Sequence, residues 1–96
     1  MTENEKDIAL FTGIVLTFQA AAMQYLGKLK NPATDKIERN LEQAQAMIDM
    51  LDMLARKTKG NLSEDERRFL ANAAQEVKLN YVDEMSKEKP EQKEPS

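Results

Sequence analysis

The sequence of 96 residues contains no cysteine and no histidine. The chain therefore has no disulfide, no thiolate nucleophile and no imidazole base, and it lacks the side chains that bind most zinc ions and haem groups. It also shows no pairing of a nucleophile with a base and no glycine-rich loop of the type that holds a phosphate. From these absences we expect no cofactor, no metal site and no enzyme activity.

An excess of positive charge is missing as well. Lysine and arginine contribute 14 residues and the acidic side chains 17, which gives a formal net charge of −3. Nucleic acid binding depends on a cationic surface, so nucleic acid is not an expected partner. The first residues, MTENEKD, are acidic where a secretory signal would be basic. We therefore expect a cytoplasmic protein.

What the sequence does contain is an uncharged stretch from Ile8 to Gly27, in a chain that is 32% charged. About 20 residues are enough to cross a bilayer, so this stretch has the length of a membrane span. Polar side chains interrupt it, and Gln19 near its middle would need a hydrogen-bond partner in lipid. We favour a buried or interface helix, and a bilayer anchor formed by residues 8–27 is the alternative.

The spacing of the apolar residues predicts that this stretch belongs to a first helix over residues 5–30. Asn4 and Asp7 are spaced like a helix start. Pro32 disfavours helical backbone in the residue before it, so the helix is expected to stop there.

Apolar spacing and capping residues predict two further helices. The second begins at residue 37 or at Asn40 and ends at residue 59, where Gly60 is placed for a left-handed cap. Ser63 and Glu66 form a capping box for the third helix, which ends near residue 86. The short connection makes the second and third helices an antiparallel hairpin.

The predicted fold is therefore all-α, a three-helix bundle in which a long apolar first helix packs on a hairpin of the second and third. Residues 1–85 form a single helical domain. Residues 86–96 contain no large apolar side chain and are expected to be a flexible tail.

The first helix has two unlike faces when its residues are placed about 100° apart. One carries the side chains expected in the core: Phe11, Val15, Phe18, Ala22, Tyr25 and Leu29. The opposite face carries small or neutral residues: Gly13, Thr17, Ala20, Gln24 and Gly27. Small residues allow another helix to come close, so we expect a homo-oligomer, most simply a two-fold dimer, that associates through Gly13, Thr17, Ala20 and Gln24. Coverage by the N-terminal segment or by the following connection is the alternative.

Met50 and Met53 of the second helix lie away from the stripe formed by Leu41, Ile48 and Leu51. Methionine packs adaptably, so these two side chains are also candidates for an interaction surface. The alternative is that they fill a second buried face of the same bundle.

Charged clusters have simpler explanations than ligand binding. Basic residues near the hairpin complement a helix dipole and have acidic neighbours, so they are not expected to bind an anion. They are Arg56, Lys57, Lys59, Arg67 and Arg68. Carboxylates at helical spacing, such as Asp49 with Asp52, are expected to be solvated because no histidine accompanies them.

Three segments stand out together: FTGIVLTFQAAAMQYLGKLKNPATDK, NLEQAQAMIDMLDML and KTKGNLSEDERRFL. The chain resembles, from Ile8 to Met85, the bacterial proteins grouped as domain of unknown function 1844. The run over residues 57–62 is the most specific part of the likeness. The resemblance implies a small all-helical bacterial protein and brings no catalytic residues with it.

The sequence thus predicts a non-enzymatic, cytosolic, self-associating helical module that interacts with proteins as an adaptor or accessory subunit. The competing prediction is a small membrane-associated protein anchored by residues 8–27. A third class, an anion-binding protein or an enzyme, has no supporting group of residues.

Overall fold

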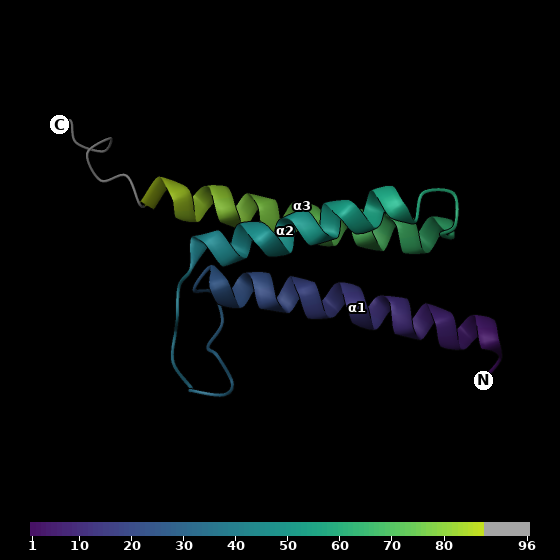
Figure 1. The fold of residues 1–96 in the computed structure, drawn as a ribbon, viewed down its shortest axis with the longest axis horizontal. Coiled ribbons are helices and arrows are strands. Elements are labelled where there is room, and N and C mark those ends of the chain that lie inside the picture. The colour runs from purple at the N-terminus through teal and green to yellow at the C-terminus, as the bar shows by residue number, and fades with distance from the viewer. Residues whose placement is uncertain (88–96) are drawn as a thin grey trace.

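The computed structural model describes residues 1–87, which form three α-helices (Figure 1). They are α1 (Glu3–Tyr25), α2 (Leu41–Lys57) and α3 (Glu64–Lys87). α2 and α3 form an antiparallel hairpin, and α1 packs on both, so the predicted three-helix fold is confirmed. α3 ends at Lys87, one residue from its predicted end near residue 86. The remainder of the predicted tail, residues 88–96, lies outside the described residues.

α1 begins earlier than predicted, because a capping box precedes Asn4. The Thr2 hydroxyl accepts a hydrogen bond from the Glu5 N–H at 3.1 Å, and the Glu5 carboxylate accepts one from the Thr2 N–H at 2.8 Å. Two of the unpaired N–H groups at the helix start are satisfied in this way. Asn4 is therefore inside the helix, and the prediction that it marks the start is wrong.

α1 also ends earlier than predicted, at Tyr25. Gly27 has a φ of +83°, and its N–H donates to the Gln24 carbonyl at 3.0 Å while the Lys28 N–H donates to the Met23 carbonyl at 2.9 Å. These two bonds form a Schellman motif, which satisfies the last carbonyls of a helix. Gly27 is thus a helix cap and not, as predicted, a member of the small-residue face.

The hairpin follows the sequence prediction closely. The Asn40 side chain accepts from the Gln43 N–H at 3.1 Å and so caps α2. Ser63 and Glu66 form the predicted capping box, with reciprocal bonds of 2.9 and 3.1 Å. Gly60 is left-handed as predicted, with a φ of +85°, although α2 has already ended with Thr58 as its cap.

The core draws on all three helices. The buried apolar side chains are Val15, Ala22, Leu26, Ala44, Ile48, Leu51, Leu70, Ala73, Ala74 and Val77. Of the predicted core face of α1, Val15 and Ala22 are buried, and Phe11, Phe18 and Tyr25 pack against the core. The prediction is wrong for Leu29, which is 48% exposed because the helix ends before it.

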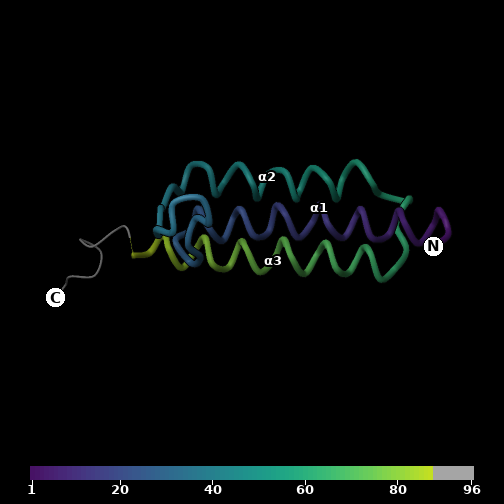
Figure 2. The backbone as a smooth tube through the Cα atoms, turned by 90° about the horizontal axis from the view of Figure 1, so that it is seen from below, coloured from purple at the N-terminus to yellow at the C-terminus, as the bar shows by residue number. Residues whose placement is uncertain are grey.

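The helices form two layers, one made of α2 and α3 and the other of α1 alone. Figure 2 shows α1 lying along the line between α2 and α3. The connection from α1 to α2, residues 26–40, extends past the C-terminal end of α1 on the side away from the other two helices (Figure 1). We call this segment the α1–α2 loop.

Candidate interaction surface

The side of α1 that points away from α2 and α3 remains exposed. Its outer face consists of Leu10, Gly13, Ile14, Leu16, Thr17, Ala20 and Gln24. The side chains of Leu10, Ile14 and Leu16 keep large exposed fractions, 57%, 46% and 48%. No residue of this face is charged, so it presents an apolar surface to water along most of the helix.

A shallow hollow lies at the middle of the outer face. It is lined by Leu10, Gly13, Ile14 and Thr17, among others. A Cβ atom added to Gly13 would meet nothing within 4 Å, so the absent side chain leaves open space there. The Thr17 hydroxyl donates to the Gly13 carbonyl at 2.7 Å, and the helix itself therefore satisfies this polar group.

A second hollow lies closer to the C-terminal end of α1. It is lined by side chains of α1, of the α1–α2 loop and of α3: Leu16, Gln19, Ala20, Met23, Lys28, Leu29 and Glu76. The outer face is therefore continuous with the loop that projects beside it.

The predicted interaction residues fall into two groups. Gly13, Thr17 and Ala20 are exposed on the outer face, and Gln24 is half-buried at its end. Met50 and Met53 are 38% and 37% exposed on α2 and line neither hollow. They do not fill a buried face of the bundle.

The polar residue in the middle of the uncharged stretch has a partner inside the molecule. Gln19 is half-buried, and its amide donates to the Glu76 carboxylate of α3 at 2.7 Å. α1 is thereby joined to α3 by a hydrogen bond in addition to the apolar contacts.

A buried carboxylate holds the α1–α2 loop against α3. Glu84 is only 6% exposed, and it lies 2.9 Å from Arg39 Nε and 2.8 Å from Lys28 Nζ. The Arg39 guanidinium also donates to the Glu84 carbonyl at 2.9 Å, and Lys87 lies 2.9 Å from the carboxylate. Both ends of the loop are therefore tied to one residue of α3.

The charges around Glu84 keep it ionised. The hydrogen bonds from Lys28 and then Lys87 lower the pKa of Glu84 to about 2, although burial acts in the opposite direction. The pKa of Lys28 is raised in turn, by Glu84 first and Asp83 second. Sequence reasoning missed this cluster, and the available signal was that Glu84 interrupts the apolar stripe of α3 one turn after Tyr81.

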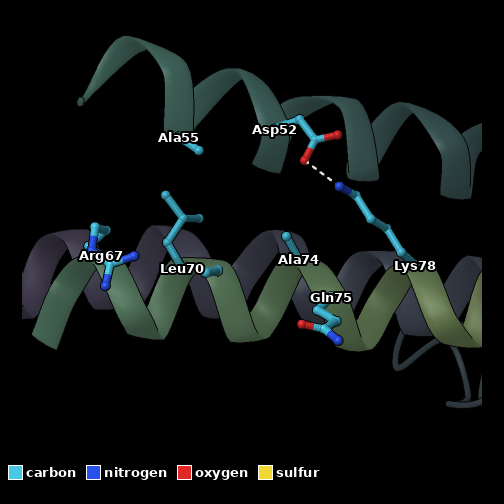
Figure 3. A pocket seen from close by; sticks show the side chains of 8 residues that line it. Asp52, Ala55, Arg67, Leu70, Ala74, Gln75 and Lys78 are labelled. Atoms are coloured by element: carbon cyan, nitrogen blue, oxygen red, sulfur yellow. Dashed lines mark ion pairs between the residues drawn. The ribbon is translucent and has the colours of Figure 1, made fainter. Parts of the chain in front are cut away.

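α2 and α3 enclose a groove of about 530 Å³ on another side of the molecule (Figure 3). Its apolar lining includes Ala55, Leu70 and Ala74, and the ion pair between Asp52 and Lys78 crosses it at 2.9 Å. Arg67, at the other end, is paired with Glu64. Because both cations are already paired, the groove does not favour a bound anion.

The carboxylates considered as metal ligands are engaged in the same way. Asp52 pairs with Lys78, and Asp49 accepts a hydrogen bond from Gln45 at 2.9 Å. Among residues 1–87, no three carboxylates converge as a metal site would require.

α1 is long and apolar enough to cross a membrane. A stretch of 18 residues in this helix has a mean hydropathy of 1.4, and 11% of that stretch is buried inside the molecule. The core helix of a soluble protein can meet the same criterion, so length and composition alone do not distinguish the two.

These features define a small all-α bundle in which the first helix carries no charge on either side from Ile8 to its end. Residues 8–84 match the family described as Domain of unknown function (DUF1844), and the chain belongs to this family, as the resemblance predicted. No curated protein and no solved structure gives a significant match. The family description names no activity.

Proposed function

We propose that this protein is a non-enzymatic, cytosolic interaction module that associates with itself through the outer face of α1. The role is that of a helical adaptor or accessory subunit. The observation that carries the proposal is the exposure of Leu10, Ile14 and Leu16 on one uncharged helix face. Soluble monomers rarely expose contiguous apolar surfaces of this kind, because water contact with them is unfavourable.

The shape of the outer face supports contact with another helix. Gly13 and Ala20 are exposed and small, so a second backbone can approach α1 closely. Thr17 bonds within its own helix and loses no hydrogen bond when it is covered. Burial of Leu10, Ile14 and Leu16 would then supply the favourable free energy of association.

A charge placed on the outer face tests this function. At about 10 µM, light scattering should give an oligomer mass for the unmodified chain, and Ala20→Glu should weaken association at least about tenfold by burying an unpaired carboxylate. Because Ala20 is exposed, the helical signal in circular dichroism should not change.

The matched control is Leu79→Glu, which places the same charge at a side chain of α3 that is 63% exposed. This variant should keep the oligomer mass. A monomer mass for the unmodified chain would refute self-association. An oligomer that tolerates Ala20→Glu would exclude the outer face of α1 as the interface, and Met50→Glu with Met53→Glu would then test α2.

Membrane association is the second candidate, because α1 has the length and hydropathy of a bilayer span. Insertion would, however, remove Val15, Ala22 and Leu26 from the core and break the bond between Gln19 and Glu76. Extraction tests this alternative. We expect the protein in the soluble fraction, whereas retention in membranes after carbonate washing would favour the anchor.

A further inference from the structure

We draw no further inference here: the strongest candidate, the groove between α2 and α3, has its charged side chains already paired, Asp52 with Lys78 and Arg67 with Glu64, and nothing in the structure shows what covers its apolar lining.

Discussion

α1 and α2 contact the same core but present different surfaces to water. α2 is amphipathic: Ile48 and Leu51 are buried, while Asp49 and Arg56 are exposed on the other side. α1 also buries one side, through Val15 and Ala22, yet its exposed side carries Leu10, Ile14 and Leu16 and no charge from Ile8 onward. Packing within one chain accounts for the composition of α2 except for the exposed Met50 and Met53, but it does not account for the exposed side of α1.

The difference separates the residues that the fold requires from those that are available to bind a partner. A helix that only has to cover a core needs one apolar stripe, and charged residues on its other side improve solubility. α1 departs from this rule along its outer face, where large apolar side chains are exposed and charged ones are missing. Departures of this kind are expected where a surface is used for binding.

The largest expected effect contrasts a buried leucine with an exposed one. Leu51→Ala removes a fully buried side chain and should lower the free energy of unfolding by about 2 to 4 kcal/mol, through lost burial and a cavity. Leu16→Ala, at a side chain that is 48% exposed, should cost less than about 1 kcal/mol in the isolated chain. Denaturant unfolding below the association constant measures both. Equal losses would show that the outer face contributes to the fold of the single chain.

An intermediate effect is expected at the anchor of the α1–α2 loop, and it depends on pH. The pKa of Glu84 is lowered from 4.5 to about 2, so its contribution to stability is complete above pH 4.5 and is lost as the pH falls towards 2. Glu84→Gln should therefore destabilise the protein at pH 7 by about 1 to 3 kcal/mol and flatten the acid limb of its stability profile. Thermal unfolding from pH 2 to 7 measures this. A variant that loses stability equally at pH 2 and pH 7 would contradict the assigned pKa.

Local signals in the sequence predicted most of the fold. The boundaries at Asn40 and Ser63 followed from side chains that cap their own helices, and the interior followed from apolar spacing. The observed end of α1 differs from the predicted one because the cap formed by Gly27 ends the helix before Pro32 is reached. Leu29 lies outside the core for the same reason.

The candidate site was only partly predictable. Composition indicated that Gly13, Thr17 and Ala20 lie on an uncharged face, and the structure places them on an exposed surface. The position of the loop beside that face depends on contacts between Arg39 and Glu84, which are 45 residues apart, and local patterns do not encode such contacts. The sequence therefore predicts the exposed outer face of α1, but it does not predict that the α1–α2 loop lies beside this face.

The smallest effects contrast two glycines of the same segment. Gly27 has a φ of +83°, and an added Cβ would lie 3.4 Å from Arg39 Cδ, so Gly27→Ala should destabilise the chain by about 1 to 2 kcal/mol. Gly13 is helical with open space around it, so Gly13→Ala should stabilise the isolated chain by up to about 1 kcal/mol. Denaturant unfolding in dilute solution gives both values, since dilution keeps association out of the measurement. If Gly13→Ala also destabilised the dilute chain, other side chains of the same copy would already fill the space beside Gly13. The outer face of α1 would then not be open at Gly13, and the two sides of the helix would not differ there.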